Sequence, residues 1–340
     1  MPNLNTLTNR FFDRRRAMRP TWRTWLKHTA LLLITLFTVT IAGVLQPFGI
    51  IEIFPDVNPE TASEILGFLA AFPSHYFHLI VSTVLALWAD PAVLKYGLSF
   101  SLSLLFILTA HESGHYIACR IYGVDATLPF FIPLPPLLGP AGTLGAFIKI
   151  VSPMPSRRAT FDIGVAGPIA GFIALIPVAV IGLLTTKHVP PTAESAFGLH
   201  FADPLFTHFL AWILGIDLTG GMFNAFSAAA WLGLLITSLN LIPSGQLDGG
   251  HAVYAVFGER FHFFTGRIAF VVMVLLSCLG FYLYSSPSGI LFAILLFIMM
   301  RVRHPEPLDP TPLDLKRKIV AALTLIIFIL CFVPFPVQVL

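Results

Sequence analysis

Residues 105–119 read Leu-Phe-Ile-Leu-Thr-Ala-His-Glu-Ser-Gly-His-Tyr-Ile-Ala-Cys, so a His-Glu-x-x-His pattern lies inside an otherwise apolar run. Side chains at positions i and i+4 of a helix lie on the same face, one turn apart. His111 and His115 can therefore direct two imidazole rings at one metal ion. Glu112 can reach a water molecule on that ion without binding the ion itself. This pattern is typical of a zinc hydrolase, in which two histidines hold the metal and a carboxylate takes a proton from the water.

The apolar setting strengthens this interpretation, because a pattern this short can arise by chance. Three ionisable side chains in an apolar helix cost several kcal/mol to place in lipid, and such residues usually mark a functional site. The whole chain has the composition of a membrane protein: 56% of its residues are hydrophobic and 11% are charged, whereas soluble domains carry about 25% charged residues. The three cysteines lie far apart in apolar stretches, so no disulfide framework is predicted.

Apolar runs of about 20 residues, separated by Gly and Pro, recur along the chain and predict an all-α polytopic membrane protein. We expect about seven transmembrane helices, at about 28–49, 98–121, 160–185, 225–243, 266–284, 286–300 and 318–338. With the N-terminus in the cytoplasm, all but Lys95 and Lys187 of the 20 Lys and Arg residues lie on the cytoplasmic side. Residues 76–89 are apolar but short, and a crossing there would invert everything downstream, so we expect an interfacial or re-entrant segment.

This map divides the chain into four parts. Residues 1–27 form a basic segment that we interpret as a cytoplasmic anchor, with a transit peptide or a contact with anionic lipid as alternatives. Residues 28–97 hold the first transmembrane helix, an outer loop and the interfacial segment. Residues 98–257 form the core that carries the motif, and residues 258–340 hold the C-terminal transmembrane helices. Residues 142–151 alternate partly between apolar and polar, which fits either a small membrane-associated β element or a plain loop.

A catalytic zinc usually has three protein ligands and one open position. The stretch Asn240-Leu-Ile-Pro-Ser-Gly-Gln-Leu-Asp248-Gly-Gly-His251 offers Asp248 as the third ligand, just past an apolar helix. The competing interpretation is that Asp248 caps a helix that begins at His251. Asn240 could donate a hydrogen bond to the developing oxyanion of a peptide carbonyl or hold the substrate backbone, or it could bond another helix. His251 could orient Asp248.

The two motifs together resemble the site-2 protease family of intramembrane zinc metalloproteases. The resemblance covers about residues 98–257 and includes the Gly-Pro-Ile-Ala-Gly stretch at 167–171. It implies that His111, His115 and Asp248 hold one Zn²⁺ per chain and that Glu112 is the catalytic base. It also implies that Asn240 is the asparagine of the second motif, and that a β element beside the site pairs with an unwound substrate.

The resemblance thus implies a zinc metalloendopeptidase that cleaves transmembrane segments of membrane proteins. The expected partners are a single-span transmembrane substrate and the lipid bilayer, with no nucleic acid, and the sequence does not fix the oligomeric state. The alternatives are a catalytically silent membrane scaffold of the same fold and a metal transporter. A multi-pass location in a bacterial plasma membrane is the simplest expectation, and an organelle membrane is the alternative.

Overall fold

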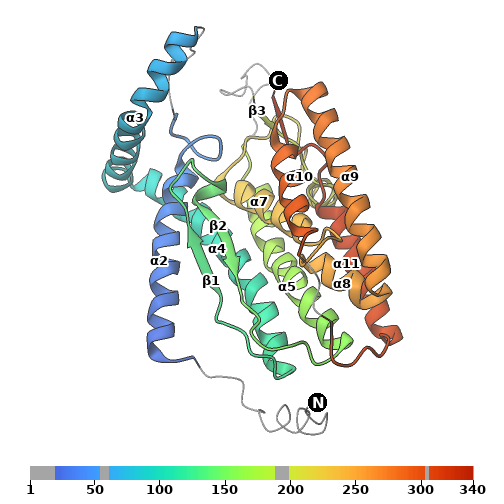
Figure 1. Cartoon of the computed structure of the whole chain (residues 1–340). Helices are drawn as coiled ribbons and strands as arrows, with labels where there is room; N and C mark the ends of the chain where they lie inside the picture. Colours follow the sequence, from blue (N-terminus) through green and yellow to red (C-terminus); the bar gives the residue numbers. More distant parts are fainter. Residues whose placement is uncertain (1–19, 54–60, 188–198, 303–305, 340) are drawn as a thin grey trace.

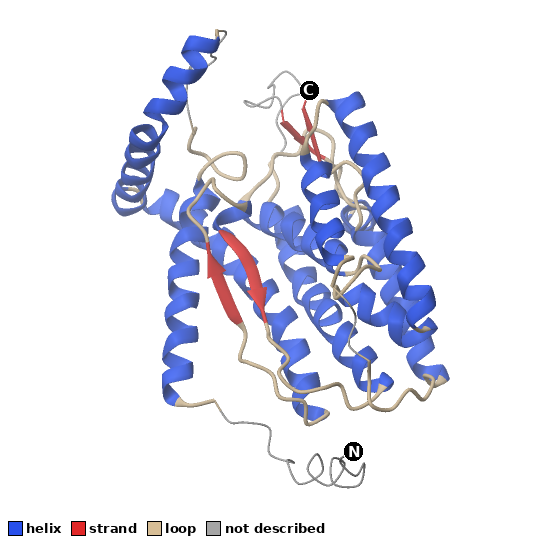
Figure 2. Ribbon diagram, viewed as in Figure 1, coloured by secondary structure: helices blue, strands red, loops and turns tan. Residues whose placement is uncertain are grey.

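The computed structural model describes residues 20–53, 61–187, 199–302 and 306–339, and most of them are helical (Figures 1 and 2). The larger helices are α2 (Trp22–Val44), α3 (Ala62–Ala89), α4 (Pro91–Ile121), α5 (Arg157–Leu184), α7 (Ala225–Asn240), α9 (Glu259–Tyr284) and α11 (Leu315–Cys331). Shorter helices are α6 (Leu205–Leu214), α8 (Asp248–Phe257) and α10 (Ser288–Met299). The helical class predicted from composition is confirmed. The N-terminal part of the basic segment, residues 1–19, lies outside the described residues.

The core of the molecule forms where α4 packs against α2, α5 and α7. Helix α4 begins where the Asp90 side chain accepts a hydrogen bond from the Ala92 amide, with Pro91 at the first helical position. Its side chains Phe100, Leu104 and Ile107 are buried among those of the neighbouring helices. The apolar run that carries the His-Glu-x-x-His pattern is thus held at the centre of the bundle.

Among the described residues, five helices are long and apolar enough to cross a membrane: α2, α3, α4, α5 and α9. The prediction of seven spans is therefore not confirmed. The apolar runs at 225–243, 286–300 and 318–338 form helices of only 16, 12 and 17 residues. The first ends at Asn240, before the helix-breaking Pro243, and the second begins only after Pro287, its N-cap residue.

The segment at 76–89, which we expected to be interfacial or re-entrant, is not a short piece of its own. It is the second half of α3, a continuous helix of 28 residues that begins with a capping box between Thr61 and Glu64. Near the end of α2, the Thr40 hydroxyl lies 2.8 Å from that of Ser101 near the start of α4. Helices α2 and α4 therefore run antiparallel, and α3 connects their ends on one side of the bundle while projecting away from it (Figure 1).

A two-stranded antiparallel hairpin, β1 (Phe130–Pro133) and β2 (Thr143–Phe147), confirms the small β element (Figure 2). Its inward side chains Phe131 and Ala146 are buried in the main core. The Thr38 hydroxyl of α2 donates to the Gly142 carbonyl at 2.8 Å, at the start of β2. The hairpin is thus anchored to α2. A second small sheet pairs β3 (Leu199–Phe201) with β4 (Val337–Val339).

Candidate metal centre

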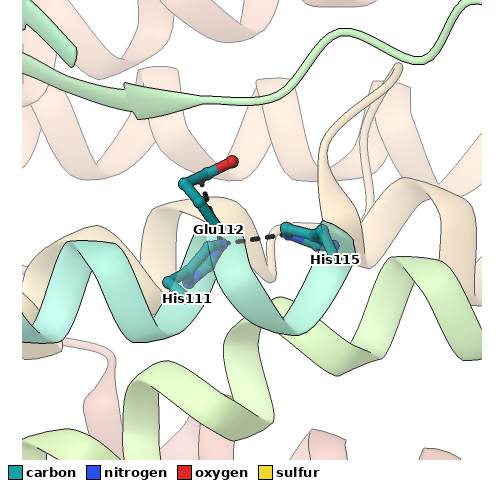
Figure 3. Close-up of side chains that lie close together, drawn as sticks. All are labelled: His111, Glu112 and His115. Atoms are coloured by element: carbon teal, nitrogen blue, oxygen red, sulfur yellow. Dashed lines mark hydrogen bonds and ion pairs between the residues drawn. The ribbon is translucent and has the colours of Figure 1, made fainter. Parts of the chain in front are cut away.

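The two histidines of the motif lie on the buried side of α4 and approach each other closely. His111 and His115 are 4% and 7% exposed, and their Nε2 atoms are 3.2 Å apart (Figure 3). The i, i+4 spacing on a regular helix produces this juxtaposition, as the sequence predicted. Helix α4 continues for about 15 Å beyond His111, given a rise of about 1.5 Å per residue.

Asp248 is brought to the same point from a distant part of the chain. Its Oδ2 atom lies 3.3 Å from the Nε2 atom of His111 and 3.3 Å from that of His115. Asp248 is the first residue of α8, which follows Leu247 at the N-cap position. The alternative that Asp248 caps a helix beginning at His251 is therefore wrong, because the helix starts three residues earlier.

Two glycines after Asp248 make this approach possible. A Cβ atom on Gly249 would lie 2.0 Å from the Leu241 carbonyl oxygen, and one on Gly250 would lie 2.5 Å from that of Gly245. The loop between α7 and α8 thus folds tightly back on the first turn of α8. In addition, the Arg157 guanidinium of α5 donates to the Ala255 carbonyl at 2.6 Å, near the end of α8. Both ends of α8 are therefore fixed.

The three candidate ligand atoms have the spacing of ligands in a tetrahedral zinc site. In a tetrahedral site with bonds of about 2.0–2.1 Å, neighbouring ligand atoms are about 3.3 Å apart. The Nε2 atoms of His111 and His115 and the Oδ2 atom of Asp248 form a triangle with edges of 3.2, 3.3 and 3.3 Å. These residues could therefore occupy one face of a zinc tetrahedron and leave its fourth position open.

The hydrogen bonding of His115 also indicates a positive charge between its Nε2 atom and the Asp248 carboxylate. Its Nδ1 atom lies 2.7 Å from the Ile163 carbonyl oxygen, which can only accept, so Nδ1 carries a proton. In a neutral imidazole the Nε2 atom then presents a lone pair to the lone pairs of the Asp248 carboxylate. Two acceptors at 3.3 Å repel each other unless a positive charge lies between them, and either a proton on Nε2 or a metal ion such as zinc would supply it.

Glycines on the facing helices allow α4 and α5 to meet at this depth. A Cβ atom on Gly167 of α5 would lie 2.0 Å from the His115 Nε2 atom, and one on Gly171 would lie 3.1 Å from His111. A Cβ atom on Gly114 of α4 would lie 2.4 Å from the Ala166 carbonyl oxygen. The Gly-Pro-Ile-Ala-Gly stretch therefore provides the space that the imidazoles occupy.

Glu112 is buried beside the histidines but is further from them than Asp248. Its Oε1 atom is 4.0 Å from the His111 Nε2 atom. The carboxylate lies on the side of α4 that faces the hairpin segment (Figure 3), where it accepts a hydrogen bond from the backbone amide of Ile148, just after β2. Glu112 thus lies next to the ligand triangle, while a backbone group of the hairpin holds it.

Asn240 joins the cluster from the end of α7. Its Nδ2 atom is 3.3 Å from the His111 Nε2 atom. His251, one turn after Asp248 on α8, packs against α5, where a Cβ atom on Gly164 would lie 2.8 Å from its own Cβ atom. The structure thus brings the five predicted site residues together: His111, Glu112, His115, Asn240 and Asp248. The Ile163 carbonyl and the Ile148 amide were not predicted, since backbone groups leave no side-chain signal.

Comparison with known proteins adds independent information. The model of "Peptidase family M50" matches residues 99–280. The rice (Oryza sativa subsp. indica) protein named "Probable zinc metalloprotease EGY2, chloroplastic" is 29% identical over 233 residues, which cover 66% of this chain and 40% of the relative. The Arabidopsis thaliana protein named "Probable zinc metalloprotease EGY1, chloroplastic" is 29% identical over 248 residues, or 70% of this chain and 43% of the relative. This chain therefore spans less than half the length of these relatives.

Proposed function

The chain belongs to peptidase family M50, and from this premise we propose that it is a zinc-dependent endopeptidase that cleaves peptide bonds within the membrane. The observation that carries the proposal is the triangle of His111, His115 and Asp248 ligand atoms, with edges of 3.2–3.3 Å. It lies between α4 and α5, two of the helices able to cross a membrane. The names of the relatives, probable zinc metalloproteases, agree with this proposal.

In this proposal Asp248 is the third ligand and Glu112 is the base. Both carboxylates are near the imidazoles. The Asp248 Oδ2 atom is 3.3 Å from the Nε2 atoms of both histidines, whereas the Glu112 Oε1 atom is 4.0 Å from the Nε2 atom of His111. The longer separation leaves room for a water molecule between Glu112 and the open ligand position. One zinc ion per chain, when bound, would lower the pKa of such a water and polarise the substrate carbonyl.

In this proposal the proton transfers and the stabilisation of the oxyanion are carried out by residues of the chain. Glu112 takes a proton from the attacking water, holds it on its carboxylate and returns it to the leaving amine. The Ile148 amide fixes the Glu112 carboxylate during this transfer. Asn240, 3.3 Å from the His111 ring, donates its amide to the developing oxyanion or to the substrate backbone.

The substrate class follows from where the site lies. The ligand triangle is about 15 Å inside the end of α4, so a peptide that reaches it from the bilayer comes from a transmembrane segment. The backbone amides of a transmembrane helix are hydrogen-bonded to one another, so the segment has to unwind before hydrolysis. We therefore propose a single-span membrane protein as substrate, with the hairpin available to pair with the unwound strand.

The proposed location is an integral, multi-pass position in a membrane, with the segment before α2 in the cytoplasm or the matching compartment of an organelle. Charge asymmetry supports this orientation. This distribution of basic residues is compatible with a bacterial plasma membrane and with an organelle membrane. The relatives whose names place them in chloroplasts favour the organelle.

The test is cleavage of a single-span substrate with helix-breaking residues in its transmembrane segment, reconstituted with the protein in liposomes. We expect cleavage by the wild type, loss on chelation and recovery with zinc. Glu112→Gln, which keeps the side-chain shape, should lose at least about 100-fold in rate. Glu306→Gln, in an exposed loop, should cleave like the wild type. A wild type that binds zinc and moves it across the liposome membrane without proteolysis would instead indicate a transporter, and binding with neither activity would indicate a scaffold.

A further inference from the structure

A polar cluster at one end of the bundle joins three helices that are far apart in the sequence. The Arg317 guanidinium of α11 binds the Asp162 carboxylate of α5 at two points, with Nη2–Oδ2 and Nε–Oδ1 distances of 2.6 and 2.9 Å. The Tyr122 hydroxyl, at the end of α4, donates to the same Asp162 carboxylate. Arg317 Nη2 also donates to the Tyr122 oxygen at 3.1 Å. The cluster therefore connects the ends of α4, α5 and α11.

The cluster is adjacent to the backbone group that orients a proposed metal ligand. Asp162 immediately precedes Ile163, whose carbonyl accepts the Nδ1 proton of His115 at 2.7 Å. Tyr122 follows His115 by seven residues, which is about two helical turns, so both side chains lie on the face of α4 that meets α5. The Arg317 contacts thus fix the two helices on either side of the His115–Ile163 hydrogen bond.

We propose that Arg317 is a positioning residue for His115, acting through Asp162 and the Ile163 carbonyl. This inference rests on the proposed function, since it assigns Arg317 a role in holding the His115 lone pair towards the metal. Arg317 lies outside residues 99–280, which match the family model, and it contacts none of the proposed ligands directly. Its effect is on the separation and register of α4 and α5.

The packing between α4 and α5 sets the position that such a residue would hold. Gly164, Gly167 and Gly171 face α8 and the imidazoles, while Ala159 and Ile163 of α5 are buried in one cluster with Ala118 and Cys119 of α4. A register shift of α5 would move the Ile163 carbonyl together with these side chains. A two-point guanidinium–carboxylate contact defines both distance and orientation. The Arg317 and Asp162 side chains are 24% and 28% exposed, so they are only partly screened by water.

The chain contains its own matched control. Arg317 also binds Asp314, the N-cap residue of α11, with Nη1 2.5 Å from Oδ2. This local pair, three residues apart in the chain, does not join α11 to α5. Asp314→Asn removes a charge from the same arginine and keeps an oxygen that can accept from the Arg317 amide. A buried leucine of α6, Leu210, provides a second control. Leu210→Ala lowers stability without touching the cluster.

The experiment titrates the full-length, metal-depleted protein with Co²⁺ and follows the visible ligand-field spectrum. We expect Arg317→Gln and Asp162→Asn each to weaken Co²⁺ binding about tenfold, the low end for residues that support metal ligands. The double variant should be no weaker than either single one. Arg317→Lys, which keeps the charge but not the two-point contact, should bind with intermediate affinity. Asp314→Asn and Leu210→Ala should bind Co²⁺ like the wild type.

A second readout does not depend on metal. In metal-free protein labelled with ¹⁵N-histidine, the Nδ1–H signal of His115 should be present in the wild type and in Asp314→Asn, and exchange-broadened in Arg317→Gln. Unchanged Co²⁺ affinity and an unchanged His115 signal in Arg317→Gln would overturn the positioning role. Equal loss of Co²⁺ affinity in Leu210→Ala would also overturn it, because the loss of affinity would then result from lower stability of the fold and not from the missing Arg317 contacts. A wild type that binds no metal would refute the proposed function, while the histidine signal would still decide the role of Arg317.

Discussion

Among single residues, Gly167 contributes to the site by having no side chain. A Cβ atom there would lie 2.0 Å from the His115 Nε2 atom, so His115 would have to leave its position. We predict that Gly167→Ala lowers zinc affinity at least about tenfold and destabilises the fold by about 1–3 kcal/mol through overpacking. Zinc content after dialysis and thermal unfolding measure the two effects.

The matched control for this change is Gly67→Ala on α3. A Cβ atom on Gly67 meets nothing within 4 Å, and alanine favours a helix. This variant should keep its zinc and its thermal stability. Full zinc occupancy in Gly167→Ala would show that the space between α4 and α5 is not needed for the imidazoles.

Asn240 allows a prediction that separates binding of the metal from catalysis. Its amide is 3.3 Å from the His111 Nε2 atom, but the proposal gives it a role towards the substrate. Asn240→Ala should therefore keep its zinc and lower kcat by about 100-fold, as expected for the loss of one oxyanion donor. If zinc were lost and kcat per bound zinc were unchanged, Asn240 would instead be a support for His111.

The residues of the site differ in how far the sequence predicted them. The histidines and Glu112 follow from helical periodicity alone, and the structure brings them together as expected. Spacing could not identify Asp248, because its position depends on how the loop after α7 folds onto α8. The Ile163 carbonyl and the Ile148 amide could not be predicted at all, since any residue type provides them.

Among the elements, the hairpin is the one that contacts the proposed base. Glu112 accepts a hydrogen bond from the Ile148 amide, and proline has no amide hydrogen to give. We predict that Ile148→Pro lowers the cleavage rate at least about tenfold while zinc is retained, because Glu112 loses the group that fixes it. Ile148→Ala keeps the amide and should cleave at nearly the wild-type rate. Equal rates for the two variants would exclude this role of the hairpin.

Element boundaries were predicted less well than element types, and α3 shows why. The acidic stretch around Glu60 and Glu64 is typical of a loop, but Thr61 and Glu64 form the capping box that starts a helix. The apolar residues at 76–89 then continue that helix instead of forming a separate piece. Thr61 and Glu64 mark the start of this helix, whereas the hydropathy pattern places the apolar segment at residue 76, about four turns after the helix begins at Ala62.

For the whole molecule, the testable property is its orientation. The antiparallel arrangement of α2 and α4, with the charge asymmetry, predicts that the loop before α11 faces the cytoplasmic side and that the loop after α6 faces the opposite side. In intact cells or right-side-out vesicles, a membrane-impermeant maleimide should label Thr219→Cys but not Thr311→Cys, both in a Cys278→Ser background. Both positions are exposed in the structure. The reverse labelling pattern would invert the proposed topology.

The fold class was predictable from composition, while the number of spans was not. Apolar runs at 225–243 and 286–300 have the composition of spans, yet α7 and α10 are only 16 and 12 residues long. Helix α7 is short because the chain turns at Pro243 to bring Asp248 to α4. The site therefore limits the length of that helix, and a single-sequence hydropathy pattern does not record this requirement.

The central claim is that Asp248, and not Glu112, is the third zinc ligand. The most direct measurement is the zinc content per chain of purified wild type, Asp248→Asn and Glu112→Gln after dialysis at one free zinc concentration. We predict about one zinc per chain in the wild type and in Glu112→Gln, and at least about tenfold weaker binding in Asp248→Asn. Full occupancy in Asp248→Asn together with loss of zinc from Glu112→Gln would exchange the two roles and contradict the account.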